Sequence, residues 1–223
     1  MLLVQRKNLL NWIAICLGSV VLFITFSQNV WFAFFAGVIL LLLRNRKEWG
    51  RVKNITFYLI IILSLILPLV SAIFVANNSV YYFELSLRRR FLLSFISGLL
   101  VSSNSLVGVG LGNFIPSMVS LIQRQNLTLN ETIWWLQPVH NIYLLVLVEA
   151  GIVGFMAFCF SLYKLLLKAV SKFDVAMLLI LITGFADHYW LTLQQNFLLF
   201  CLICGFLLQK ELVQYKSYEG KHK

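Results

Sequence analysis

Six apolar segments constrain the fold of this chain more than any other feature. They are Leu9 to Phe26, Val30 to Leu43, Ile55 to Val75, Ile142 to Tyr163, Val175 to Ala186 and Phe197 to Leu208. A helix that crosses a bilayer needs about 20 apolar residues, so the shorter segments must use flanking residues. Hydrophobic residues make up 61% of the chain and charged residues 12%, unlike a soluble domain. We predict an all-α integral membrane protein with about six transmembrane helices in three hairpins.

The last two segments are predicted to be separate helices. As one helix, Val175 to Leu208 would be about 50 Å long, which is too long for a single crossing. Asp187 and His188 also stand near its middle, where a polar turn between two helices is expected.

The distribution of basic residues predicts the orientation in the membrane, because Lys and Arg are retained on the cytoplasmic side. If the chain crosses six times with both termini in the cytoplasm, only four of the 18 basic residues lie outside. These four are Arg88, Arg89, Arg90 and Arg124. The net charge of +10 then reflects membrane anchoring, and no nucleic acid partner is expected. The predicted location is the cytoplasmic (inner) membrane.

This orientation divides the chain into four parts. In order, they are three transmembrane helices in 1–75, a large extracytoplasmic loop region in 76–140, three transmembrane helices in 141–210, and a basic cytoplasmic tail in 211–223. In the outer region, Phe91 to Val101 is apolar but short, which predicts a helix lying in the interface. Trp134 and Trp135 predict a lid resting on the membrane surface.

A glycine-rich turn and two polar positions stand out near the fourth segment. Gly108, Gly110 and Gly112 can take positive φ, which serves either an anion-binding nest or close packing of the loop on helices. Glu149 is two turns into a predicted span, where we expect a structural hydrogen bond to a neighbouring helix or the glycine loop. Asn141 suits an N-cap, and the positive helix end favours a neutral imidazole at His140.

The order and spacing of these parts resemble a known family. GVGLGNF at Gly108 to Phe114, His140-Asn141, and EAGIVG at Glu149 to Gly154 resemble the C-terminal signature of the O-antigen ligase and polymerase superfamily of membrane glycosyltransferases. The resemblance runs from about Thr25 to the last apolar segment and covers the C-terminal half of the family's usual length. It implies a missing N-terminal half, which a partner chain would supply.

The resemblance implies transfer of a glycan from a polyprenyl-diphosphate carrier to a hydroxyl on a lipid or polymer acceptor, with inversion, at the outer membrane face. In the family an arginine about eighteen residues before the glycine turn stabilises the diphosphate, which here implies Arg90, with Arg88 or Arg89 as substitutes if the helix is rotated. His140 would deprotonate or orient the acceptor. His140 and Arg90 are the implied catalytic residues.

Further substrate-binding positions are implied by the resemblance. Gln28 takes the place of a family arginine, and members often carry an acidic turn like that at Asp187. The full predicted substrate-binding set is Gln28, Arg88, Arg89, Gly108, Gly110, Asn141 and Asp187. No group of residues has the spacing of a divalent-metal motif, so we expect no metal and no cofactor.

Two alternatives stay open, and a third is more distant. A polymerase that extends the glycan carries the same signature. An incomplete, non-catalytic half that binds lipid-linked glycan or needs a partner chain is favoured by Gln28, because glutamine lacks the charge of arginine. A transporter or scaffold would place its intramembrane charges along a path between the faces, whereas the predicted groups gather on one face.

Overall fold

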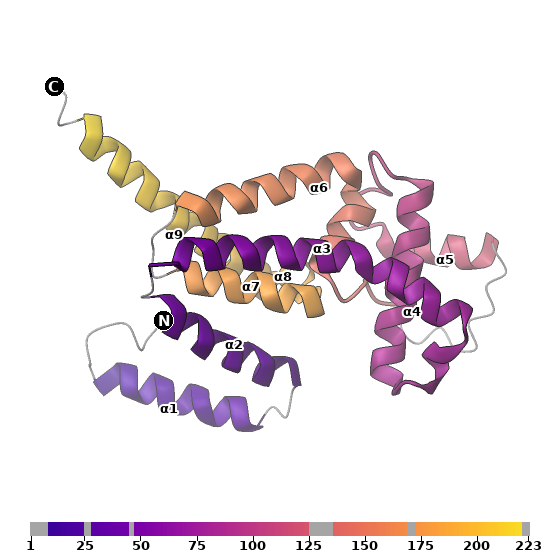
Figure 1. The fold of residues 1–223 in the computed structure, drawn as a ribbon, viewed down its shortest axis with the longest axis horizontal. Coiled ribbons are helices and arrows are strands. Elements are labelled where there is room, and N and C mark those ends of the chain that lie inside the picture. Colours follow the sequence, from indigo (N-terminus) through magenta and orange to yellow (C-terminus); the bar gives the residue numbers. More distant parts are fainter. Residues whose placement is uncertain (1–8, 25–27, 45–46, 125–135, 169–172, 220–223) are drawn as a thin grey trace. The chain divides into compact units, whose positions relative to one another are not determined.

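The computed structural model describes residues 9–24, 28–44, 47–124, 136–168 and 173–219, which form helices and contain no strand (Figure 1). The elements in order are α1 (Leu9–Ile24), α2 (Gln28–Arg44), α3 (Trp49–Ala76), the 3-10 helix η2 (Ser79–Tyr82), α4 (Leu85–Ser103), α5 (Phe114–Arg124), α6 (Ile142–Lys168), α7 (Asp174–Ala186), α8 (Tyr189–Thr192) and α9 (Gln194–Glu219). The all-α prediction is confirmed. The predicted lid at Trp134 and Trp135 lies outside the described residues, as does the end of the predicted tail, 220–223.

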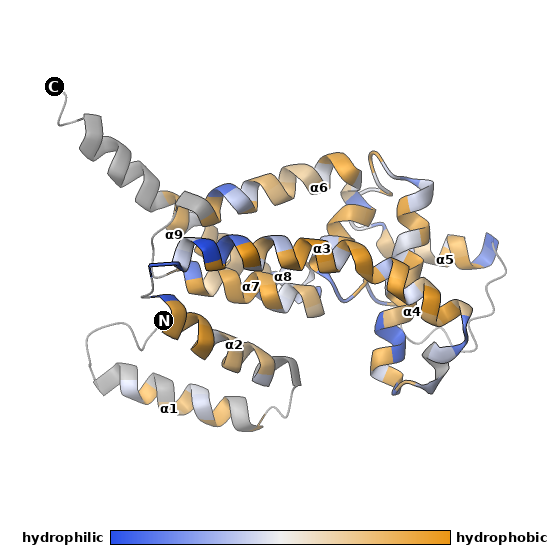
Figure 2. Ribbon diagram, in the orientation of Figure 1, coloured by the Kyte–Doolittle hydropathy of each residue, from blue (hydrophilic) through white to orange (hydrophobic). Residues whose placement is uncertain are grey.

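Two of the described helices are long and apolar enough to cross a membrane, Trp49–Ala76 and Ile142–Leu166. Shorter apolar helices are Trp31–Leu43, Asp174–Ala186 and Gln194–Leu208. In Figure 2 the first turns of α3 are hydrophilic and the rest of the helix is hydrophobic. Large apolar side chains along α3 are exposed, as lipid contact requires; examples are Leu59, Ile62, Leu69 and Ile73. Six crossings stay a prediction.

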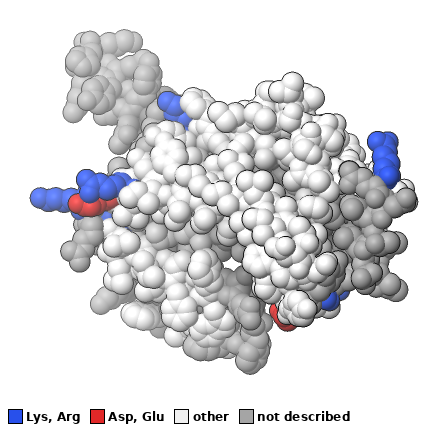
Figure 3. Space-filling model, turned by 45° about the vertical axis from the view of Figure 1, so that its right-hand side comes forward, with Lys and Arg blue, Asp and Glu red and all other residues white. Residues whose placement is uncertain are grey.

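Charged side chains are sparse on the face of the molecule drawn in Figure 3. They form small groups there, and most of the visible described surface is uncharged. Since a bilayer core excludes charge and accepts apolar surface, this distribution fits the membrane environment that the composition predicts.

The chain forms two compact units that do not follow sequence order. The first comprises Met1–Phe57, Tyr163–Thr183 and Gln194–Lys223, and the second Tyr58–Leu162 and Gly184–Leu193. The short segment Gly184–Leu193 is the turn predicted between the last two apolar segments, and it belongs to the second unit. Every residue of the candidate site described below lies in the second unit.

The second unit is packed around α4, which is longer than predicted. It begins at Leu85 and includes all three arginines, whereas the sequence predicted a helix only over Phe91–Val101. Its buried face contacts α5, α6 and the segment before α6, in a core of Leu92, Leu93, Ile96, Leu100, Phe114, Met118, Val139, Leu144, Leu145 and Val148. The three arginines interrupt the apolar sequence near the start of α4, so a search for apolar length alone misses the residues before Phe91.

The glycine-rich loop is interlocked with an interruption in α6. Gly151 has φ 66° and ψ −173°, which breaks the helix in its middle. The N–H groups that lose their helical partners, those of Ile152 and Val153, donate to Ser105 O at 2.8 Å and Leu106 O at 3.3 Å. In return, the freed carbonyls of Val148 and Glu149 accept from Val109 N–H and Gly110 N–H, both at 2.9 Å. A broken helix is tolerated at membrane depth when protein groups satisfy its backbone, as here.

The backbone hydrogen bonds of this loop show how three of its N–H groups are used. The N–H groups of Gly108, Val109 and Gly110 all donate to backbone carbonyls, so these three groups form no anion-binding nest. Gly108 has φ +73°, and a Cβ there would stand 2.5 Å from the backbone of Glu149 and Gly151. The close packing of the loop on α6 therefore explains why residue 108 is a glycine.

Replacing Gly108 by alanine is expected to destabilise the second unit by about 2–5 kcal/mol. Positive φ costs alanine about 1–2 kcal/mol, and the overlap with the α6 backbone adds about 1–3 kcal/mol. Gly112→Ala is the matched control, because Gly112 has φ +74° but open space around its Cβ position. Thermal unfolding in detergent should show a clearly larger loss for Gly108→Ala. Equal losses would mean that the interlock with α6 contributes nothing.

A buried ion pair lies in the first unit and includes Lys53, one of the basic residues that the charge distribution assigned to the cytoplasmic side. Lys53 Nζ is 3.3 Å from Asp174 Oδ2 and donates to Leu166 O at 2.7 Å. Trp49 Nε1 donates to the same carboxylate oxygen at 3.3 Å. Lys53 and Asp174 are 3% and 1% exposed. This cluster joins the start of α3 to the end of α6 and the start of α7.

Candidate functional site

The site is built on the N-terminus of α6. Asn141 Oδ1 accepts from the N–H groups of Tyr143 at 2.9 Å and Leu144 at 3.0 Å, so Asn141 is the predicted N-cap. Its Nδ2 donates to Ser64 Oγ of α3 at 3.1 Å, and the residue is fully buried. Since these bonds use both ends of the amide, Asn141 fixes the backbone from which His140 projects.

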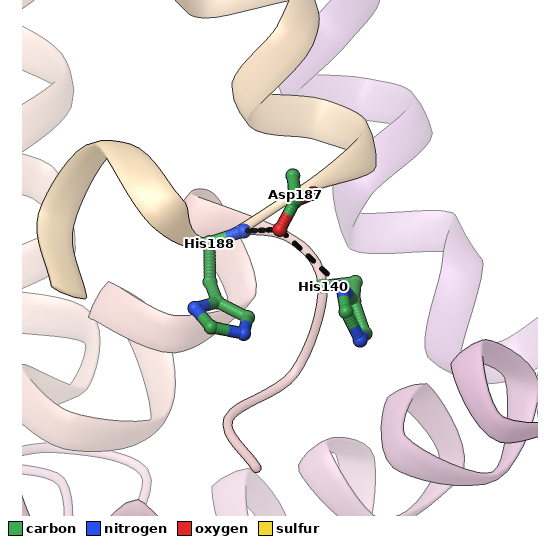
Figure 4. A group of neighbouring side chains, drawn as sticks. All are labelled: His140, Asp187 and His188. Atoms are coloured by element: carbon green, nitrogen blue, oxygen red, sulfur yellow. Dashed lines mark hydrogen bonds and ion pairs between the residues drawn. The ribbon is translucent and has the colours of Figure 1, made fainter. Parts of the chain in front are cut away.

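The His140 imidazole meets the turn between α7 and α8. His140 Nδ1 lies 3.3 Å from Asp187 Oδ1, and the backbone N–H of His188 donates to the same oxygen at 2.8 Å (Figure 4). The two imidazole rings are 5.1 Å apart between centroids, and Tyr189 packs against both. Figure 4 shows both rings on the same side of the Asp187 carboxylate. The structure thus brings together the predicted residues His140 and Asp187.

The environment of Asp187 keeps it ionised. Burial acts to raise its pKa, but the hydrogen bond and charge of His140 and the N–H of His188 outweigh burial, so the pKa lies below its ordinary value. A carboxylate can only accept, so in the neutral form of His140 the proton is on Nδ1 and the lone pair on Nε2. This tautomer is the one that a general base requires.

His188 is held neutral beside this pair. Burial, reinforced by the charges of His140 and Arg90 and opposed by Asp187, lowers the pKa of His188 to about 4. Sequence reasoning noted His188 in the polar turn but did not include it among the site residues. Its position next to Asp187 was the available signal.

The three arginines of α4 have different surroundings. Arg90 Nη1 donates to Ala186 O, the last carbonyl of α7. A cation at this position stabilises α7, because the C-terminus of a helix carries partial negative charge. This bond ties α4 to the turn that carries Asp187 and His188. Arg89 Nε is buried and has no hydrogen-bond partner among the described residues. Arg88 is also partly buried.

Glu149 has the structural role that the sequence predicted. Its Oε1 accepts from the N–H of Phe114, the first residue of α5, at 3.3 Å. A carboxylate at a helix N-terminus satisfies an otherwise unpaired N–H and interacts favourably with the helix dipole. Glu149 therefore connects α6 to the end of the glycine loop through both its carbonyl and its side chain.

Gln28 is the first residue of α2 and lies in the first unit, so its predicted role in substrate binding stays a prediction. Gly108 and Gly110 shape the loop that packs on α6, and substrate binding at these two glycines also stays a prediction. One ligand atom from each of His140, Asp187 and His188 lies within 4.8 Å of the others. This grouping was not visible in the sequence, because 46 or more residues separate His140 from the other two.

Comparison with known proteins adds a family assignment. The family model described as O-antigen ligase matches residues 13–159, which include α2 to α5, the glycine loop, His140 and Glu149. Asp187 and His188 lie beyond the matched range. No curated protein and no solved structure gave a match to the chain. Since the match covers more than half of the sequence, the chain belongs to the O-antigen ligase family.

Proposed function

We propose that this protein transfers a glycan from a polyprenyl-diphosphate carrier to an acceptor hydroxyl. The observation that carries the proposal is the His140–Asp187 pair at the start of α6, within a chain of the O-antigen ligase family. Asp187 fixes the tautomer of His140 and leaves Nε2 free to take a proton.

In the proposed reaction His140 Nε2 accepts the proton of the acceptor hydroxyl. The hydroxyl oxygen attacks the anomeric carbon, and the bond from that carbon to the diphosphate oxygen breaks, with inversion. Asp187 stabilises the imidazolium that forms, because its carboxylate already lies 3.3 Å from Nδ1. The polyprenyl diphosphate leaves with the electron pair of the broken bond.

The leaving diphosphate is stabilised by the arginines of α4. Arg89 offers a buried N–H that has no hydrogen-bond partner within the described part of the chain, and Arg90 lies close enough to His188 for its charge to lower the pKa of His188. Guanidinium groups bind phosphate oxygens through paired, charge-assisted hydrogen bonds, so this stabilisation needs no metal.

Competition by product analogues tests this assignment. Polyprenyl diphosphate, the released product, is expected to inhibit transfer competitively with the donor. Arg89→Gln is expected to weaken that inhibition about 10-fold or more, because it removes a charge-assisted hydrogen bond to the diphosphate. Arg124→Gln is the control, because Arg124 is exposed at the end of α5 and should leave inhibition unchanged. Equal inhibition of the wild type and Arg89→Gln would remove Arg89 from the diphosphate site.

We further propose that the site faces the extracytoplasmic side of a multi-pass protein in the cytoplasmic membrane, with both termini inside. The positive-inside distribution of basic residues supports this orientation. In a cysteine-free background, Leu111→Cys in the exposed glycine loop should react with an impermeant thiol reagent in intact cells, whereas Glu48→Cys should react only after permeabilisation. Protection of position 111 and labelling of position 48 would invert the orientation.

A further inference from the structure

His188 has a buried nitrogen that the proposed reaction does not use. Thr192 Oγ1 lies 2.7 Å from His188 Nδ1 and 3.2 Å from His188 O, so the Nδ1 nitrogen has a hydrogen-bond partner. The other ring nitrogen, Nε2, carries a lone pair in the tautomer in which Nδ1 donates to Thr192. Nε2 is buried without a hydrogen-bond partner among the described residues, on a side chain of a residue that is only 5% exposed. A buried ring nitrogen without a partner is costly, and a ligand would account for it.

His188 belongs to a group of three side chains that can bind a metal ion. One ligand atom from each of His140, Asp187 and His188 lies within 4.8 Å of the others. The other ring nitrogen of His188, Nδ1, lies 2.7 Å from Thr192 Oγ1, an oxygen to which a metal-bound imidazole could donate, as metal-ligating histidines usually do. The backbone N–H of His188 donates to the Asp187 carboxylate at 2.8 Å. Two independent features, the orphaned nitrogen and the surrounding hydrogen bonds, therefore point to a cation.

We propose that His140, Asp187 and His188 form a binding site for a divalent cation of the zinc class. Two imidazoles and one carboxylate favour Zn²⁺, Co²⁺ or Ni²⁺ over Mg²⁺ and Ca²⁺, which prefer all-oxygen ligands. Ligands at about 2.1 Å from one tetrahedral ion are about 3.4 Å apart, so small side-chain rotations must close the present spacing. A fourth position stays open for water or a substrate oxygen.

This site is distinct in its chemistry from the proposed transfer, which needs no metal. Because coordination engages His140 and Asp187, a bound cation removes the base that the proposed function requires. The cation is therefore an inhibitor of the transfer. This consequence, unlike the site itself, rests on the proposed function.

Cobalt spectroscopy of the full chain in detergent tests the site without any activity assay. After chelator treatment and removal of any affinity tag, Co²⁺ titration should give visible d–d absorption that saturates at one ion per chain and is abolished by added Zn²⁺. His188→Ala should weaken Co²⁺ binding at least 100-fold, because it removes a ligand. Thr192→Val should weaken it about 10-fold to 100-fold, because it removes only the hydroxyl that orients the His188 imidazole. His222→Ala, which changes the third histidine of the chain, should leave the titration unchanged.

Three results would overturn the site. They are an absence of saturable d–d absorption, a titration that is the same for the wild type and His188→Ala, and strong near-ultraviolet thiolate bands that assign the ion to cysteines. Asp187→Asn, which preserves side-chain shape, gives a second ligand test if His188→Ala does not fold. If Zn²⁺ binds as described and transfer continues at the same rate, the site stands, and the role of His140 as base is wrong.

Discussion

Replacing His140 by alanine is expected to lower the rate of glycan transfer by about 10²- to 10⁴-fold, the usual contribution of a general base. The base acts on the chemical step, so kcat should fall while the KM for the lipid-linked donor changes little. Purified variants in lipid nanodiscs, assayed with excess donor and acceptor, give both parameters. Asn141 and the α6 N-terminus do not depend on the His140 side chain, so the variant should fold normally.

Asp187→Asn is the matched partner of this variant. The amide keeps the size of the carboxylate, and its oxygen can still accept from Nδ1–H, but it lacks the negative charge that stabilises the imidazolium, so kcat should also fall. Combining the two changes should cost little more than His140→Ala alone, because the residues act as a unit. Full additivity of the two losses, or wild-type kcat in His140→Ala, would exclude the proposed pair.

Asp174→Asn is expected to destabilise the first unit by about 3–5 kcal/mol. The change removes the carboxylate that lies 3.3 Å from the buried Lys53 ammonium, and breaking a buried ion pair by removing one partner is strongly destabilising. Thermal unfolding in detergent measures the loss. The double variant Lys53→Met and Asp174→Leu, which removes both charges, should recover much of the stability.

The exposed pair Arg51–Glu48 is the internal control for this effect. Its N–O distance is 3.0 Å, but the two side chains are 70% and 64% exposed. Glu48→Gln should therefore cost less than about 1 kcal/mol. A loss in Asp174→Asn as small as that in Glu48→Gln would mean that Lys53 reaches solvent in the functional protein.

Features that depend on local sequence could be predicted. Each of the six apolar segments falls within a described helix, apart from Thr25 and Phe26 at the end of the first, because hydrophobic length is a local property. The N-cap at Asn141 followed from residue type next to an apolar run. The bond from Glu149 to the glycine loop could be anticipated because a carboxylate in a predicted span must have a partner.

Features that depend on distant contacts could not be predicted. In the sequence, Lys53 indicates only which side of the membrane this segment faces. Its ion pair with Asp174 and its bond to Leu166 O form only when α3, α6 and α7 come together. The interruption at Gly151 is visible only when the loop from Ser105 to Gly110 supplies its backbone partners. His188 becomes a site residue because Thr192 orients it and the turn brings it to His140. None of these pairings has a signature in sequence spacing.

The most direct test of the proposed function is the balance of products from a defined donor. Purified wild-type protein in nanodiscs is incubated with a labelled polyprenyl-diphosphate glycan and an excess of hydroxyl acceptor, and both products are quantified over time. The proposed reaction predicts one polyprenyl diphosphate released for each glycan joined to the acceptor, with neither formed by His140→Ala. Lipid-linked glycan that binds but stays intact over many hours with the wild type would contradict it.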